Sequence, residues 1–137
     1  MPAVTGIVET CLQVADLSRS IEFYRSLFGW PLLTSDARMA ALAVARGQLL
    51  LLFLQGGSEK GMPIAGGLIP GHGGSGRLHV AFGIPRTELE DWKRRLEEAS
   101  IALAGTVHWP EGGVSLYFRD PDQHLVELAT PGIWPNY

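Results

Sequence analysis

The chain has 137 residues, of which 46% are hydrophobic and 18% charged, which fits one folded domain and excludes a disordered chain. Its net charge of −3 comes without a basic stripe, so we expect neither nucleic acid nor a membrane surface as a partner. The single cysteine, Cys11, excludes an internal disulfide, and apolar runs such as Leu49 to Leu54 are too short to cross a membrane. No signal peptide is visible, so a cytoplasmic location is expected.

The first half of the chain predicts one strand, one helix and three further strands. Residues 8–14 alternate as a strand does, and Asp16 can cap the helix that follows. Apolar residues recur at helical spacing as far as Gly29, which can end the helix: Leu17, Ile21, Tyr24 and Phe28. Strand-like segments follow at residues 31–34, 39–45 and 48–55.

Residues 56–76 form a glycine-rich bridge between the two halves. This segment holds nine of the 17 glycines together with Pro63 and Pro70, so we expect no regular strand or helix in it. Two interpretations stand side by side: a lid or binding loop, and a passive linker.

The second half repeats the order of elements. Residues 78–84 predict a strand, and Thr87 with Glu90 predicts a capping box at the start of a helix. The apolar stripe of that helix comprises Leu89, Trp92, Leu96 and Ala99. Strand-like segments follow at residues 103–109, 114–119 and 124–129, with a turn at 120–123.

The order β-α-β-β-β, read twice, predicts an α+β protein made of two modules. We expect a single domain over residues 1–137, with modules at 7–55 and 77–130 joined by the bridge at 56–76. A four-stranded sheet with one helix is covered on one face only, so two such units can form a curved mixed sheet around a central cavity.

Three residues are candidate metal ligands. Glu127 lies in an apolar strand, where a buried carboxylate needs a cation or hydrogen-bond donors, although a solvated strand end or an arginine pair would also explain it. Glu9 and His79 open the first strand of each half at an offset of 70 residues. Alone, a strand histidine is more often structural, and an acid near the start of a strand is usually just solvated. Together, two carboxylates and one imidazole suit a divalent first-row metal ion with positions left for a substrate.

The sequence resembles the vicinal oxygen chelate superfamily of glyoxalases, fosfomycin- and bleomycin-resistance proteins and extradiol dioxygenases. The segments that carry the resemblance are residues 14–17, 23–24, 27–29, 79–82, 116–122 and 125–128. The resemblance implies paired modules, a homodimer and a metal held by His79 and Glu127. Glu9 matches a ligand position by place but not by type, since the family most often has histidine there, and Leu51 at the fourth position cannot bind a metal.

The metal would be a divalent ion: Fe, Mn, Ni or Zn, with Mg as a further option. Together with two carboxylate ligands such an ion is nearly neutral, which makes it a weaker Lewis acid. We therefore expect a glyoxalase-like enzyme whose small substrate chelates the metal through adjacent oxygens, with lyase, isomerase or transferase chemistry. An Fe(II) extradiol dioxygenase and a metal-free protein that sequesters a small molecule are the alternatives. Use of a thiol cosubstrate and the origin of Glu9, from the same chain or a partner, stay open.

Glu127 is also a catalytic candidate, because a metal-bound carboxylate can exchange between the roles of ligand and base. Other residues are candidates beside the three ligands. Tyr117 is a catalytic candidate if it pairs with Glu127 across the last hairpin, which requires a loop longer than four residues or a bulge. His72 in the bridge is a second, as a general acid or base, although an exposed loop histidine is equally expected. We expect substrate contacts from Cys11, Gln13, His108 and Arg119. Arg119 can alternatively brace the acidic turn, and we interpret His124 as non-catalytic.

Overall fold

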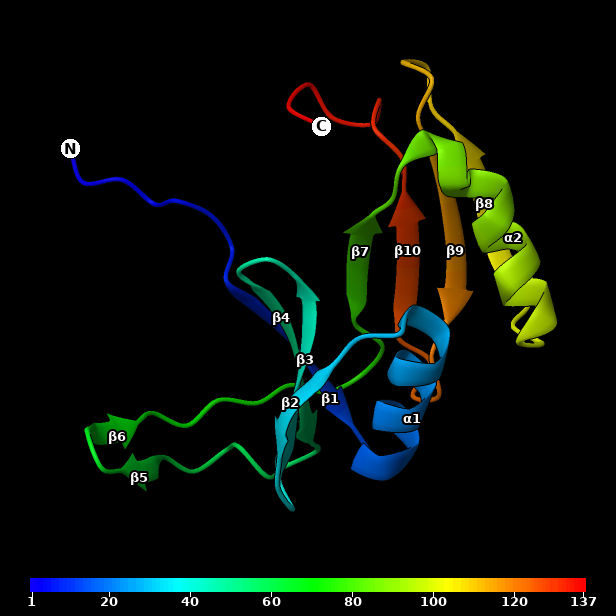
Figure 1. The fold of residues 1–137 in the computed structure, drawn as a ribbon. Helices are drawn as coiled ribbons and strands as arrows, with labels where there is room; N and C mark the ends of the chain where they lie inside the picture. The colour runs from blue at the N-terminus through cyan, green and yellow to red at the C-terminus, as the bar shows by residue number, and fades with distance from the viewer. The chain divides into compact units, whose positions relative to one another are not determined.

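The computed structural model describes all 137 residues and divides into two compact units, Met1–Ser75 and Gly76–Tyr137 (Figure 1). Each unit contains one βαβββ module, which confirms the predicted α+β fold class. None of the helices has the length and apolar character that a membrane span requires.

The first unit has a four-stranded mixed sheet. Its elements are β1 (Glu9–Val14), α1 (Leu17–Phe28), β2 (Leu32–Ser35), β3 (Met39–Ala45) and β4 (Gln48–Leu54). The strand order is β1-β4-β3-β2, with β1 parallel to β4 and the other pairs antiparallel. Helix α1 packs on β3 and β4. Alternate strand residues on one face, such as Leu42, Leu50 and Leu52, are fully buried, and Ala41, Leu51 and Phe53 form a second buried cluster on the other face.

Helix α1 begins and ends as the sequence predicts. The Asp16 carboxylate accepts a hydrogen bond from the Arg19 backbone N–H at 3.0 Å. Gly29 adopts a left-handed conformation with φ of 73°, and its N–H donates to the Arg25 carbonyl. Tyr24, which is fully buried, anchors the helix on the sheet.

The prediction that the bridge holds no regular strand is wrong. Two short strands, β5 (Met62–Ile64) and β6 (Gly67–Ile69), pair antiparallel around a two-residue turn. The physical reason is local, because short apolar segments flank Ala65 and Gly66 and can pair despite the high glycine content around them.

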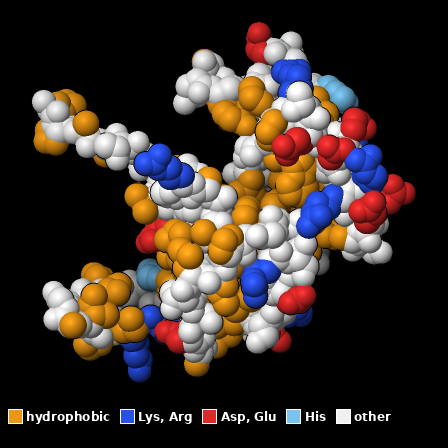
Figure 2. Space-filling view, in the orientation of Figure 1, with side chains coloured by type: hydrophobic (Ala, Val, Ile, Leu, Met, Phe, Trp, Pro, Cys, Tyr) orange, Lys and Arg blue, Asp and Glu red, His pale blue; other side chains and the backbone are white.

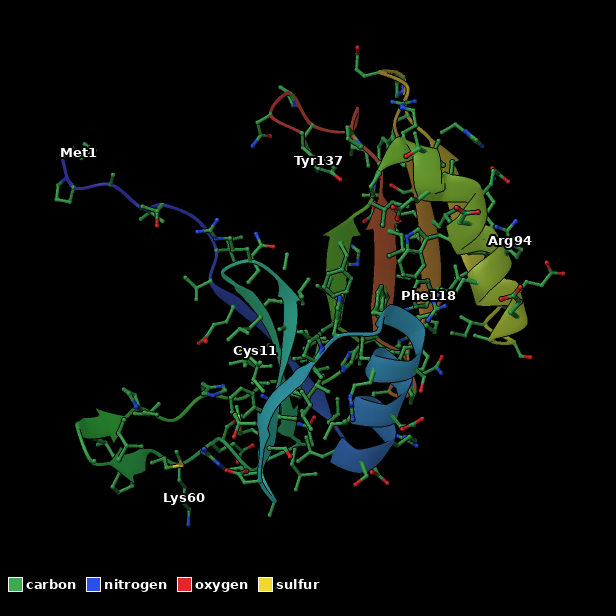
Figure 3. The ribbon with its side chains drawn as sticks, in the orientation of Figure 1. Met1, Cys11, Lys60, Arg94, Phe118 and Tyr137 are labelled. Carbon is green, nitrogen blue, oxygen red and sulfur yellow. The ribbon has the colours of Figure 1, made fainter.

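The second unit repeats the architecture. Its elements are β7 (His79–Gly83), the 3₁₀ turn η1 (Arg86–Glu88), α2 (Leu89–Glu98), β8 (Leu103–His108), β9 (Val114–Arg119) and β10 (Leu125–Ala129). The strand order is β7-β10-β9-β8, with β7 parallel to β10. After β10 the chain returns to the sheet, where the Tyr137 hydroxyl (labelled in Figure 3) donates to the Ala129 carbonyl at 2.7 Å.

The predicted capping box at the second helix is also wrong. The residue at the N-cap position is Glu88, and no side-chain cap bond forms there. The turn η1 leads directly into α2, with the Glu88 N–H bonded to the Pro85 carbonyl, so Thr87 lies inside a turn instead of at a helix start.

Candidate functional site

His79 and Glu127 meet on the open face of the second sheet. His79 is the first residue of β7, and Glu127 is the central residue of the neighbouring parallel strand β10. The His79 Nε2 atom lies 3.2 Å from Glu127 Oε2. The Glu127 side chain is buried, whereas half of the His79 side chain is exposed, so the pair is accessible from the histidine side.

Hydrogen bonding fixes which nitrogen of His79 carries the proton. Nδ1 lies 2.9 Å from the Leu125 carbonyl oxygen, which can only accept a hydrogen bond, so Nδ1 is the protonated nitrogen. In the neutral imidazole the Nε2 lone pair then faces the Glu127 carboxylate. Two electron-rich atoms at this separation need a positive charge between them, either a proton or a metal ion.

The other carboxylate oxygen of Glu127 is occupied by two donors. The Ser115 hydroxyl donates to Oε1 at 2.5 Å, and the Tyr117 hydroxyl donates to the same atom at 3.1 Å. Oε1 is therefore committed to the protein, and Oε2 is the oxygen turned toward His79. Donors that hold a carboxylate in this way are typical of the residues that orient metal ligands.

Tyr117 faces Glu127 because of the length of the last hairpin. The loop between β9 and β10 comprises five residues, 120–124, and the register pairs Tyr117 with Glu127. Burial raises the pKa of the Tyr117 phenol; the Glu127 carboxylate raises it further, and the Ser115 hydroxyl partly offsets the rise. Tyr117 therefore remains a proton donor at neutral pH.

The pair fits a divalent metal ion. Two ligands at bond lengths near 2.1 Å are separated by about 3 to 3.4 Å at right or tetrahedral angles, so the 3.2 Å between Nε2 and Oε2 matches one edge of a coordination shell. Within neither unit do three histidine, cysteine or carboxylate side chains converge.

The first unit contains a cavity of about 550 Å³ on the sheet face that carries Leu51 and Phe53. Its floor is apolar, with Met39, Leu51 and Phe53 contributed by β3 and β4. Polar residues from the sheet and the bridge complete the lining: Glu9, Cys11, Thr34, Asp36, Arg38, Ser58, Lys60 and His72. The cavity therefore combines an apolar base with both signs of charge at its edge.

His72 is held in this cavity by the bridge. Its backbone N–H donates to the Ser58 carbonyl at 2.8 Å, and its carbonyl accepts from the Ser58 hydroxyl at 2.9 Å. The imidazole ring lies edge-on to Phe53, with ring centroids 4.6 Å apart. The bridge thus places a histidine beside Phe53 of the sheet.

Cys11 and Gln13 differ in their surroundings although both lie on β1. Cys11 (labelled in Figure 3) lines the cavity, where burial and then the Glu9 carboxylate raise the pKa of its thiol. Gln13 is buried beneath the bridge, with its amide donating to the Ser58 hydroxyl at 3.5 Å.

The remaining residues considered in the sequence have other contacts or are exposed. Arg119 donates to the Gln123 carbonyl at 3.0 Å, which is the turn-bracing alternative. His108 is exposed at the end of β8. His124 is buried, and its Nδ1 accepts from the Leu78 backbone N–H at 2.9 Å, which fixes the start of β7.

Sequence reasoning missed Ser115 and Trp109. The Trp109 indole donates to the Ser115 hydroxyl at 2.9 Å, and that hydroxyl donates to Glu127. Ser115 could have been found, since it lies two residues before Tyr117 and shares its strand face. Trp109 carries no comparable signal, because its contact depends on the β8–β9 register.

Two βαβββ modules, each with one helix and a four-stranded mixed sheet, define the class of glyoxalase-fold proteins. The chain belongs to the Glyoxalase/Bleomycin resistance protein/Dioxygenase superfamily, which it matches over residues 6–128. This confirms the resemblance noted in the sequence.

Curated relatives and solved structures agree with this assignment. Metallothiol transferase FosB of Staphylococcus epidermidis is 29% identical over 93% of this chain and 82% of its own length. The FosB of Shouchella clausii is 30% identical over 93% and 81%. Lactoylglutathione lyase from Agrobacterium tumefaciens superposes with a TM-score of 0.88 at 31% identity, covering 98% of this chain and 99% of that one.

Proposed function

We propose that the protein is a metal-dependent enzyme that acts on a small substrate with two adjacent oxygens. The observation that carries the proposal is the 3.2 Å approach of His79 Nε2 to Glu127 Oε2, with the other atoms of both groups already hydrogen-bonded. This arrangement leaves one nitrogen and one oxygen lone pair directed at a common point. A divalent ion of the Fe, Mn, Ni, Zn or Mg group suits such ligands.

We propose Glu9 as the third ligand, supplied by the same chain or by a second copy. It is exposed at the start of β1 and lines the cavity of the first unit. When bound, the metal would supply Lewis-acid stabilisation of negative charge on a substrate oxygen.

The protein's own residues would orient the substrate and handle its protons. Tyr117 keeps its proton at neutral pH, and its single O–H points to Glu127 Oε1. Turned toward a bound substrate, the same O–H would donate to a substrate oxygen instead. His72 is the proposed general acid or base for a substrate that occupies the first unit's cavity. The apolar floor of that cavity would exclude water from the substrate's carbon skeleton.

Relatives of two kinds support thiol chemistry. The curated relatives are named metallothiol transferase and one solved structure is named lactoylglutathione lyase, so both names refer to a thiol or its thioester. We therefore favour two reactions: addition of a thiolate to an epoxide, in which a carbon–oxygen bond breaks as the carbon–sulfur bond forms, and isomerisation of a thiol adduct.

The first experiment distinguishes a metal ion from a proton between His79 and Glu127. Protein purified without a histidine tag would contain close to one divalent metal ion per site by elemental analysis, and a His79→Ala variant would contain far less. Absence of binding when Mn²⁺, Fe²⁺, Ni²⁺ and Zn²⁺ are each supplied would contradict the proposal and favour the metal-free binding protein.

The second experiment separates the reaction classes. The metal-loaded protein would be assayed with a small epoxide plus a thiol, with a 2-oxoaldehyde plus glutathione, and with a catechol plus Fe(II) in an oxygen electrode. We expect turnover in one of the first two assays. Oxygen uptake with the catechol would instead establish the extradiol dioxygenase.

We also propose a homodimer. The outer edges of β1 and β7 have no strand partner within their own units. Large apolar side chains are exposed on the N-terminal arm and on the β5–β6 hairpin (Figure 2), among them Val4, Ile7, Ile64 and Leu68. Light scattering after size-exclusion chromatography would give twice the chain mass of 14.9 kDa, whereas a single-chain mass would contradict the proposal.

A further inference from the structure

Trp109 is held at a fixed place beside the Glu127 carboxylate network. It follows β8 in the tight turn to β9, where its backbone N–H donates to the Gly113 carbonyl at 2.8 Å and its carbonyl accepts from Gly112 at 2.9 Å. The register pairs Val107 with Ser115, so Trp109, two residues further on, has its side chain on the Ser115 face.

The chemistry of the three groups fixes the direction of the hydrogen bonds between them. An indole nitrogen only donates, and a carboxylate only accepts. Ser115 must therefore accept from Trp109 and direct its single proton to Glu127 Oε1. Without Trp109, the Ser115 hydroxyl would be free to rotate and to donate elsewhere.

This direction determines which carboxylate oxygen is available. Because Ser115 and Tyr117 both donate to Oε1, only Oε2 of Glu127 faces His79. Hydrogen bonds in a chain also polarise one another, so the bond from Trp109 strengthens the bond that Ser115 makes to Glu127.

We propose that Trp109 is a positioning residue of the metal site, which acts through Ser115 to hold Glu127 as a ligand through a single oxygen. The inference rests on the proposed function, since it concerns how tightly and in what geometry the site binds a divalent ion. Trp109 itself would contact neither the ion nor the substrate.

The test measures Mn²⁺ affinity from the free-ion signal in electron paramagnetic resonance, together with the spectrum of the bound ion. Ser115→Ala is expected to weaken binding about 10-fold, the lower end of the effect of removing a group that orients a ligand. Trp109→Phe keeps the ring but loses the N–H, and we expect a loss of about 3-fold with a changed bound-ion spectrum.

Three further variants make the test specific. The double variant Trp109→Phe/Ser115→Ala is expected to match Ser115→Ala alone, because Trp109 acts only through the serine. Trp134→Phe removes an exposed indole and is expected to bind like the wild type. Ser115→Thr keeps a hydroxyl at this position and is expected to retain most of the Mn²⁺ affinity that Ser115→Ala loses.

Several results would overturn the inference. The first is a Trp109→Phe variant that binds Mn²⁺ like the wild type. The second is a double variant in which the losses of Mn²⁺ affinity of the two single variants multiply. The third is a Trp109→Phe variant with a lower melting temperature but unchanged Mn²⁺ affinity. Should Trp109→Phe fail to fold, the Trp109 indole N–H resonance serves instead: it should shift on Zn²⁺ binding in the wild type and move in Ser115→Ala. A static resonance refutes the inference, whereas a wild type that binds no ion refutes the proposed function and this inference with it.

Discussion

At the scale of single residues, Glu127 shows how a buried carboxylate is accommodated. Its apolar neighbours along β10 place it in the sheet, where an uncompensated charge would be strongly destabilising. Donors on the adjacent strand stabilise one oxygen, and the other faces His79. The sequence singled out Glu127 for the right physical reason, but its donors became visible only through strand pairing.

Asp36 provides a prediction about pH at the same scale. Its carboxylate accepts from the backbone N–H groups of Arg38 at 2.7 Å and Met39 at 2.9 Å, and these bonds lower its pKa. Since the folded pKa lies below the unfolded value, the stabilisation is present above about pH 4 and is lost as the pH falls through the folded pKa.

We expect Asp36→Ala to lower the free energy of unfolding by about 0.5 to 1 kcal/mol at pH 7, the range for an exposed hydrogen-bonded turn. In urea titrations this difference should shrink below about pH 4, as the wild-type carboxylate becomes protonated. Asp36→Asn, which keeps the acceptor oxygen, should lose less. A difference that stays constant into acid would rule out the carboxylate as its source.

At the scale of elements, the two helices begin in different ways. Helix α1 is capped by the side chain of Asp16, whereas α2 directly follows a 3₁₀ turn and has no side-chain cap. A capping residue ahead of a helical apolar pattern thus predicted the helix start correctly at Asp16 but wrongly at Thr87. The difference arises because Pro85 and the turn after it, not the threonine, set the backbone at the start of α2.

This contrast gives a matched pair of variants. Asp16→Ala is expected to destabilise the protein by about 1 kcal/mol through loss of the cap, while Thr87→Ala is expected to change stability by less than about 0.5 kcal/mol. Urea unfolding followed by circular dichroism would measure both. Equal losses would show that a capping box does form at the second helix.

The bridge provides another element-scale prediction. A Cβ atom at Gly71 would lie 2.1 Å from the Glu59 carbonyl oxygen, whereas one at Gly66 would meet nothing within 4 Å. Gly71→Ala is therefore expected to displace the bridge, and with it His72, at a cost of about 1 to 3 kcal/mol.

Limited proteolysis reports the displacement directly. Residues 56–76 of Gly71→Ala should be cleaved faster than those of the wild type, and Gly66→Ala should be cleaved like the wild type. Wild-type cleavage of Gly71→Ala would mean that the bridge does not depend on its contact with Glu59.

At the scale of the whole molecule, the proposed metal should couple to stability. An ion that binds only the folded state at about 100 times its dissociation constant adds about 2.7 kcal/mol to the free energy of unfolding. We expect Mn²⁺ to raise the melting temperature accordingly and a chelator to reverse the rise.

His79→Ala serves as the control for this coupling. In that variant, Mn²⁺ should leave the melting temperature unchanged, because the nitrogen ligand is absent. A rise of equal size in the variant would place the ion at another site and contradict the proposed pair of ligands.

Much of the fold followed from local patterns in the sequence. Period-two alternation and the Asp16 and Gly29 signals predicted α1 in full and the strands to within about one residue at most ends, because those signals depend on neighbours along the chain. The β5–β6 hairpin was not predicted, because the high glycine content of residues 56–76 argued against a regular strand there. The two short apolar segments that form the hairpin were a weaker signal.

The sequence by itself determined the two βαβββ modules and drew attention to His79 and Glu127. Only the tertiary structure decided that Tyr117 faces Glu127, that Ser115 and Trp109 support the carboxylate, and that His72 lies over a cavity in the first unit. The physical reason is that hydrophobic periodicity records whether a residue is buried. Register, which a single residue in a loop can shift, records which side chains meet.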